Sequence, residues 1–154
     1  MCGITGFLDE ARATGPDDLD ALVARMAATL RHRGPDGTGT WVDADAGVAL
    51  GHTRLSIIDV SAAGAQPMVS ASGRSVITYS GEVYNAADLA PDLAARGVRF
   101  RGHSDTEVLV EAIDAWGLDA TLARLNGMFA FAAWDRASRR LHLVRDRLGE
   151  KPLY

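Results

Sequence analysis

The feature that most constrains the fold is an apolar segment at the very start of the chain, residues 2–8. It is short and contains two glycines, a pattern that is typical of a buried β-strand. Because a buried strand must pair its backbone N–H and C=O groups, we expect a sheet that holds the chain almost from its first residue. The only cysteine of the chain, Cys2, opens this segment.

Later segments predict helices and strands that come in blocks. Apolar residues at helical spacing follow a Gly-Pro-Asp-Asp break, so we expect an aspartate cap to open the first helix. A Ser-Asp-Thr-Glu capping box opens a later helix, which ends at a glycine. Helices are expected at 19–30, 86–96, 104–117 and 119–125, and antiparallel strands and hairpins within 40–80 and 128–145. This order predicts an α+β fold in which helices cover antiparallel sheets, in two or four layers.

Composition narrows the classes of protein that the chain can belong to. Its 154 residues suit a single globular domain, and a formal net charge of −4 without a basic stripe argues against nucleic acid as a partner. The sequence contains neither a long apolar run nor a signal peptide, so we expect a cytoplasmic protein without a membrane span. One cysteine cannot form an internal disulfide, and four scattered histidines lack metal-ligand spacing, so no metal or cofactor is expected in this domain.

The position of Cys2 suggests a catalytic role. Removal of the initiator methionine, which is usual before a small residue, would leave Cys2 with both a thiol and a free α-amine. An α-amine has a reference pKa of about 7.7–8.0, so it can take the thiol proton directly or through a water. Nucleophile and base would then share one residue, the N-terminal variant of Ser-His catalysis. The alternative is a small apolar residue buried in an edge strand.

Three further features suit the hydrolysis of an amide. Arg54, at the end of a predicted strand, could anchor a substrate; a tight corner at residues 80–82 could supply oxyanion donors; and Asp105 lies at a predicted helix start. Each also has a purely structural explanation, as a surface ion-pair partner, a turn, and a carboxylate that favours the first helical turn.

Six stretches, taken together, are more specific than any one of them. They are MCGITG (1–6), RHRGPDG (31–37), GHTRLSIID (51–59), GEVYN (81–85), SDTE (104–107) and RDRLG (145–149). In this order they resemble the glutaminase domain of glutamine-hydrolysing asparagine synthetases, over the whole chain. The resemblance implies a class II glutamine amidotransferase with the N-terminal-nucleophile αββα fold. The second and third stretches favour the asparagine synthetase branch over the hexosamine-forming branch.

The resemblance also implies roles for individual residues. Cys2 would attack the side-chain amide of glutamine, release ammonia and form a γ-glutamyl thioester, which water hydrolyses to glutamate. Arg54 would bind the substrate α-carboxylate and Asp105 its α-ammonium, a pair that selects a free amino acid. Gly81 would supply a backbone donor to the oxyanion. The other expected glutamine-binding residues are Leu55, Ser56, Ile57, Ile58, Ser80 and Glu82.

Ser80 departs from the family pattern, which usually has Asn immediately before the Gly-Glu pair. In the family that side-chain amide joins the glycine N–H in the oxyanion hole, whereas a hydroxyl is shorter and has one donor. Losing one oxyanion donor typically costs about 2.7–4 kcal/mol, or roughly 10²–10³ in turnover. We therefore expect either a slow glutaminase or a Ser80 hydroxyl that donates through a water.

The resemblance further implies a larger parent protein. The family places a synthetase domain after this one, which uses ATP and Mg²⁺ to activate aspartate and make asparagine. Residues 2–154 are thus interpreted as a type 2 glutamine amidotransferase domain that is C-terminally incomplete, with the synthetase domain absent. The expected partners are glutamine, that synthetase domain and a second copy in a homodimer. Three alternatives remain: an amidotransferase with a different acceptor, a catalytically idle regulatory or interaction module, and a peptide hydrolase.

Overall fold

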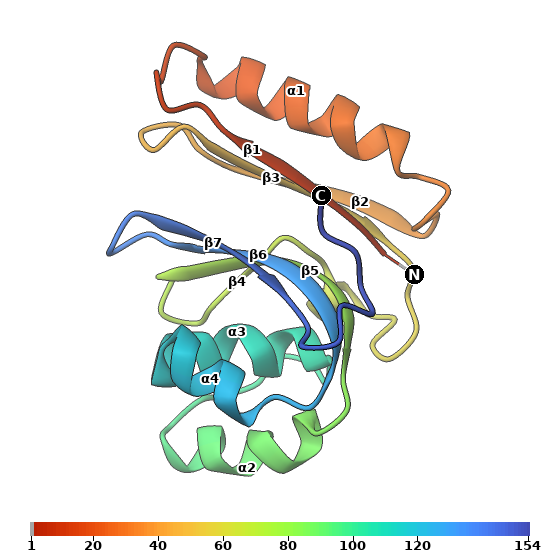
Figure 1. Cartoon of the computed structure of the whole chain (residues 1–154), viewed down its shortest axis with the longest axis vertical. Helices are drawn as coiled ribbons and strands as arrows, with labels where there is room; N and C mark the ends of the chain where they lie inside the picture. Colours follow the sequence, from red (N-terminus) through yellow and green to blue (C-terminus); the bar gives the residue numbers. More distant parts are fainter. Residues whose placement is uncertain (1) are drawn as a thin grey trace.

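The computed structural model describes residues 2–154 and consists of helix, sheet, sheet and helices, one layer on the next (Figure 1). The helices are α1 (Pro16–Thr29), α2 (Ala86–Ala95), α3 (Asp105–Trp116) and α4 (Leu118–Arg124), with a 3₁₀ turn at Ala62–Gly64. The strands are β1 (Gly3–Leu8), β2 (Gly37–Asp43), β3 (Val48–Arg54), β4 (Met68–Val69), β5 (Ser75–Val83), β6 (Gly127–Asp135) and β7 (Arg140–Arg145). The predicted α+β fold, an αββα sandwich of antiparallel sheets between helices, is confirmed.

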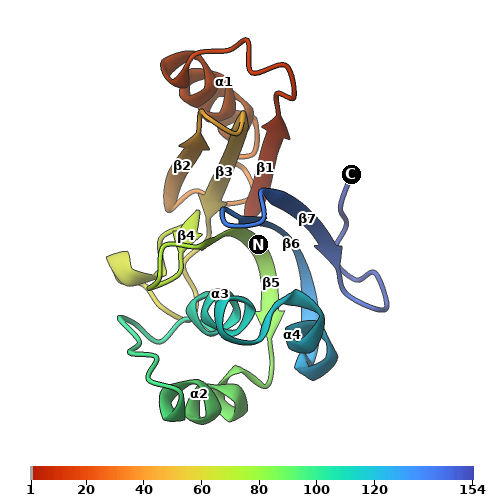
Figure 2. The same ribbon diagram turned by 90° about the vertical axis from the view of Figure 1, so that its left-hand side faces the viewer.

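The two sheets contain different parts of the chain. One has the order β1-β3-β2 and the other β4-β5-β6-β7, and every neighbouring pair is antiparallel. Helix α1 covers the outer face of the first sheet, whereas α3 and α4 cover the second, with α2 beyond α3 (Figures 1 and 2). The apolar start thus forms a strand, as predicted, but β1 is a half-exposed edge strand and not a buried one, because it pairs only with β3.

Strand periodicity divides the apolar core into layers. On β3, Val48 and Leu50 point between the sheets toward Trp134, while Ala49 points the other way and contacts Val23 of α1. On β5 and β6 the odd-numbered residues, among them Phe131, face the helices. Helix α3 lies between the second sheet and α2, and this explains why its residues from Asp105 to Ile113 are all buried.

Two local predictions were wrong. No side chain caps α1: Gly15 is its N-cap, Pro16 takes the first helical position, and the aspartates lie in the first turn, where the helix dipole favours them. Residues 80–82 form no corner, because they continue β5. Gly81 is required there for close packing, since a Cβ at this position would lie 2.2 Å from the Met128 carbonyl oxygen.

The remaining helices and hairpins agree with the prediction. Ser104 caps α3, where its Oγ accepts a hydrogen bond from Glu107 N at 3.2 Å, and Gly117 ends that helix with a φ of 81°. The Glu107 carboxylate accepts from the backbone N–H groups of Arg101 and Gly102, so the reciprocal half of the capping box is replaced by a loop contact. No helix within residues 2–154 is both long and apolar enough to cross a lipid bilayer.

His52 is a buried polar group between the two sheets. Only 1% of its surface is exposed, and its Nε2–H donates to the carbonyl oxygen of Tyr79 on β5 at 3.2 Å. Burial, helped by the nearby charge of Arg54, lowers the pKa of His52 to about 4 from an ordinary 6.5. The imidazole is therefore neutral in the folded protein at neutral pH.

This lowered pKa predicts acid sensitivity. An unfolded histidine gains a proton near pH 6.5, whereas folded His52 stays neutral down to about pH 4. Its contribution to the free energy of unfolding is therefore complete above pH 6.5 and is lost as the pH falls from 6.5 to 4. We expect the free energy of unfolding in urea to fall by about 2 kcal/mol between pH 7 and pH 5 because of this residue. His52→Gln keeps an N–H donor but has no titratable group at this position, so its free energy of unfolding should fall less over the same pH range.

The matched control is His32→Gln, at an exposed position after α1. The free energy of unfolding of this variant should fall between pH 7 and pH 5 by as much as that of the wild type. An identical pH dependence in His52→Gln and wild type would contradict the assignment.

Candidate functional site

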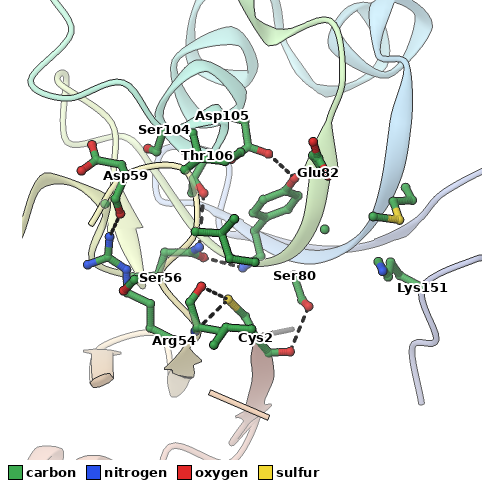
Figure 3. Close-up of a pocket in the computed structure, with 18 residues that line it drawn as sticks. Cys2, Arg54, Ser56, Asp59, Ser80, Glu82, Ser104, Asp105, Thr106 and Lys151 are labelled. Carbon is green, nitrogen blue, oxygen red and sulfur yellow. Dashed lines mark hydrogen bonds between the residues drawn. The ribbon is translucent and has the colours of Figure 1, made fainter. Parts of the chain in front are cut away.

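A cavity of about 150 Å³ opens beside Cys2, where the ends of both sheets meet the start of α3 (Figure 3). Every site residue named from the sequence lines it: Cys2, Arg54, Leu55, Ser56, Ile57, Ile58, Ser80, Gly81, Glu82 and Asp105. They come from four separate parts of the chain, and only the fold brings them together.

Cys2 is held from both sheets. Its Sγ lies 3.4 Å from Leu55 N, which donates to it, and 3.7 Å from Leu55 O, so the thiol rests against the backbone that follows β3. Its own carbonyl oxygen accepts a hydrogen bond of 2.9 Å from the Ser80 hydroxyl of β5 (Figure 3). The sulfur therefore lies at the cavity wall with its main chain fixed on the other side.

Arg54, the last residue of β3, is oriented by the loop that follows it. Its Nη1 donates to Ser61 O at 2.8 Å and its Nη2 donates to Asp59 O. These bonds use two of the five N–H donors of a guanidinium and fix its plane beside the cavity.

The RHRGPDG stretch holds the strand end that carries Arg54. Asp36 N donates to Arg54 O at 2.9 Å, and the Asp36 carboxylate accepts from Ser56 N at 2.8 Å. Gly34 lies so close to β3 that a Cβ there would be 2.3 Å from the carbonyl carbon and oxygen of Thr53. This stretch is thus a support for the site, and it does not line the cavity.

Asp105 is buried at the first position of α3. Its Oδ2 accepts from the Tyr79 hydroxyl at 2.6 Å and from Val83 N at 2.9 Å. Burial and then the Asp105 charge raise the pKa of Tyr79, which keeps this phenol protonated as a donor. The helix N-terminus favours a negative charge at this position.

The register of β5 and β6 sets the direction of the Gly81 N–H. Gly81 lies opposite Phe129, whose N–H donates to Asp146 Oδ2 and whose carbonyl accepts from Asp146 N. Both main-chain groups of Phe129 therefore point away from β5, so the Gly81 N–H points toward the other edge of β5. Tyr79 N and Val83 N share that edge, which faces the cavity.

Several lining residues were not identified from the sequence. They are Asp59, Gly64, Gln66, Tyr79, Ser104, Thr106, Met128 and Lys151. Gln66 illustrates why: its side chain accepts from Tyr79 N at 2.7 Å and donates to Thr106 Oγ1 at 3.2 Å, contacts that no local pattern encodes. Asp59 and Thr106 lie inside two of the quoted stretches, 51–59 and 104–107, and this position is the sequence feature that could have identified them.

Asp146 explains the RDRLG stretch. Burial acts to raise its pKa, but backbone N–H donors, among them those of Phe129, Glu150 and Lys151, lower it to about 2. The loop folded around this carboxylate brings Lys151 to the cavity (Figure 3). Among residues 2–154, no three His, Cys, Asp or Glu side chains converge in a way that could hold a metal ion.

Comparison with known proteins gives consistent matches. Residues 1–154 match the family described as a glutamine amidotransferase domain. The chain is 42% identical over 165 residues to a putative glutamine-hydrolysing asparagine synthetase of Mycobacterium tuberculosis and 41% identical over 156 residues to glutamine-hydrolysing asparagine synthetase 3 of Bacillus subtilis. Asparagine synthetase B of Escherichia coli is 37% identical over 154 residues.

These matches cover 100% of this chain but only 24% to 26% of the relatives, so the chain spans about a quarter of their length. A solved structure, glutamine phosphoribosylpyrophosphate amidotransferase of B. subtilis, matches with a TM-score of 0.64 and 21% identity. The match covers 87% of this chain and 34% of that one, and it shows a shared fold.

The contact of Gly34 with β3 predicts a cost for any side chain there. Gly34→Ala should lower the free energy of unfolding by about 1–3 kcal/mol, because the added methyl group meets rigid backbone. Gly37→Ala in the same stretch is the matched control, since its Cβ would meet only Arg54 Cβ at 3.8 Å. Urea unfolding of both variants tests this, and equal stabilities would contradict it.

Proposed function

Since the chain belongs to the glutamine amidotransferase domain family, we propose that it hydrolyses glutamine to glutamate and ammonia with Cys2 as the nucleophile. The observation that carries this proposal is the convergence of Cys2, Arg54 and Asp105 on one cavity (Figure 3). A thiol, a guanidinium and a carboxylate around one space match the amide, the α-carboxylate and the α-ammonium of free glutamine.

Arg54 and Asp105 form the two ends of the proposed binding site. The planar guanidinium pairs with the substrate α-carboxylate, and the Asp105 carboxylate pairs with the α-ammonium. The hydrogen bonds from the Tyr79 hydroxyl and from Val83 N both end on Asp105 Oδ2, so we assign Oδ1 to the ammonium. A glutaminyl residue inside a peptide has neither charge, and this argues against a peptide hydrolase. Residues 55–58 and Glu82 would complete the walls.

The proposed chemistry uses groups of this chain alone. The α-amine of Cys2, free once Met1 is removed, takes the thiol proton, and the thiolate attacks the side-chain carbonyl carbon of glutamine. The Gly81 N–H supports the oxyanion of the tetrahedral intermediate. Collapse breaks the C–N bond, the amine returns its proton to the leaving nitrogen as ammonia, and a γ-glutamyl thioester remains. Water then hydrolyses the thioester to glutamate and restores the thiol.

In the longer protein, we propose, ammonia passes to a synthetase domain that forms asparagine from aspartate. The sizes and names of the relatives support this assignment of residues 2–154 as the glutaminase domain of such a protein. ATP and Mg²⁺ would act only in the synthetase domain, and a cytoplasmic homodimer is the assembly that we expect. A different acceptor is the alternative, because the acceptor pocket would lie outside these residues.

Cys2→Ala tests the nucleophile. Ammonia release from glutamine should fall by at least about 10³-fold, because the thiol forms the covalent intermediate. A glutamine-like chloroketone should label Cys2 in the wild type and nothing in the variant, as read by peptide mass spectrometry. Circular dichroism confirms that the variant is folded.

Equal rates and an unlabelled Cys2 would instead favour an idle regulatory module. The mass of the purified chain tests the base separately. A protein that keeps Met1 and still turns over glutamine would rule out the α-amine of Cys2 as the base.

Substitutions of Ser80 test whether position 80 contributes to the oxyanion hole. In the structure its hydroxyl donates to Cys2 O. An asparagine side chain is longer and has two N–H donors, so it can reach the oxyanion as the hydroxyl cannot. We expect Ser80→Asn to raise kcat by about 10-fold to 100-fold at an unchanged glutamine affinity. Ser80→Ala, which removes the hold on Cys2 O, should lower kcat. An unchanged or lower kcat in Ser80→Asn would argue against an oxyanion role for position 80.

A further inference from the structure

The two ends of the proposed glutamine site come from separate parts of the fold. Arg54 ends β3 in the first sheet, and Asp105 begins α3 beyond the second sheet. The α-carboxylate and α-ammonium of free glutamine are a fixed distance apart, so Arg54 and Asp105 must also be held at a fixed separation. Some contacts must therefore link the loop after β3 to the start of α3. Gln66 donates to Thr106 Oγ1, and His103 Nε2 donates to Ile58 O, both at 3.2 Å. The carboxylate of Asp59 makes the contact that also holds the turn beside Arg54.

One oxygen of Asp59 shapes the loop that holds Arg54. Its Oδ1 accepts from Ser61 N at 2.8 Å and from Ser61 Oγ at 2.6 Å, which closes a tight turn. The carbonyl oxygens of Asp59 and Ser61, at the two ends of this turn, accept hydrogen bonds from the Arg54 guanidinium. Figure 3 shows the bond to Asp59. The turn thus decides where the guanidinium lies.

The other oxygen of Asp59 reaches the start of α3. Its Oδ2 accepts from His103 N at 3.1 Å and lies 3.5 Å from His103 Nδ1. His103 is followed by the helix cap Ser104 and then by Asp105. Only 3% of Asp59 is exposed, and the bonds from Ser61 and from His103 lower its pKa to about 2, so it is a carboxylate at neutral pH.

Gly102 shows how closely the two segments approach. A Cβ at this position would lie 2.5 Å from Asp59 Oδ2 and 2.8 Å from the Ala63 Cβ. A glycine here therefore allows the carboxylate to reach the backbone before α3. A methyl group at position 102 would push the Asp59 carboxylate away from the backbone N–H of His103.

We propose that Asp59 is a positioning residue that sets the separation between Arg54 and Asp105, and so determines the affinity for the α-amino-acid end of the substrate. This inference rests on the proposed function. Asp59 acts through its two loop contacts and needs no contact with the reacting amide. Its loss should therefore weaken substrate binding while the thiol keeps its reactivity.

The main test is Asp59→Asn. An asparagine has one carboxamide oxygen, so it can satisfy either Ser61 or His103 but must present an N–H group to the other. We expect KM for glutamine to rise about tenfold with kcat changed by less than about twofold. The Kd for glutamine, measured by calorimetry in a Cys2→Ala background, should rise by the same factor.

Two reagents separate this effect from a general loosening of the site. Labelling of Cys2 by the glutamine-like chloroketone should slow in Asp59→Asn, because that reagent carries the α-carboxylate and α-ammonium. Alkylation of Cys2 by iodoacetamide, which has neither group, should keep its wild-type rate. Gly102→Ala should give the same pattern by moving Oδ2 away from His103 N. Asp45→Asn, in the exposed turn between β2 and β3, is the matched control and should match the wild type.

An unchanged KM and Kd in both Asp59→Asn and Gly102→Ala would overturn the proposal. A parallel loss of iodoacetamide reactivity would also overturn it, because it would indicate a general structural role. If the wild type binds glutamine without turning it over, the proposed hydrolysis fails while the Kd comparison still decides the role of Asp59. If the wild type does not bind glutamine, both proposals fail.

Discussion

The site depends on a strand, β5, that lacks a neighbouring strand along most of one edge. Strand β4 pairs with β5 only at Ile77 and Val76, so the rest of that edge of β5 has no partner strand. Buried backbone N–H groups still require acceptors, and side chains provide them. Gln66 accepts from Tyr79 N, and Asp105 accepts from Val83 N. Through these bonds, the open edge of β5 holds α3 and the loop after β3 near Cys2, and the cavity lies between the loop, α3 and β5.

The six stretches quoted from the sequence contain residues that face the cavity and residues that hold those in place. Arg54 and Asp105 face it, whereas Gly34 and Asp36 support the end of β3 from behind. Asp146 does the same for the last loop, through a carboxylate surrounded by backbone donors. A short motif can therefore mark a functional site without contacting a ligand, because loops need buried acceptors as much as ligands need binding groups.

Sequence reasoning recovered the elements whose signals are local. The strand that follows Cys2, the capped helix at Ser104 and the last hairpin all follow from periodicity and turn residues. The succession of elements predicts an α+β fold, and the αββα layering is what the family resemblance implies. Tertiary contacts determine what was missed. Glycine is common in turns, so the sequence predicts a corner at Gly81, yet this residue lies within β5 and packs against β6. The roles of Gln66 and Tyr79 depend on residues distant in sequence, so no local pattern could predict them.

The contact between the two sheets changes in character along its length. At one end it is mainly apolar, with Val48 and Leu50 of β3 near Trp134, whose Nε1 donates to Asp43 of β2 at 3.1 Å. Toward the cavity, hydrogen bonds cross from β5 to the first sheet: Thr78 Oγ1 donates to Gly51 O, Tyr79 O accepts from His52, and Ser80 Oγ donates to Cys2 O. Apolar surfaces can slide over one another at small cost, whereas directional bonds at successive residues allow a single alignment. Hydrogen bonds from three successive residues of β5 therefore fix how the two sheets align beside the thiol.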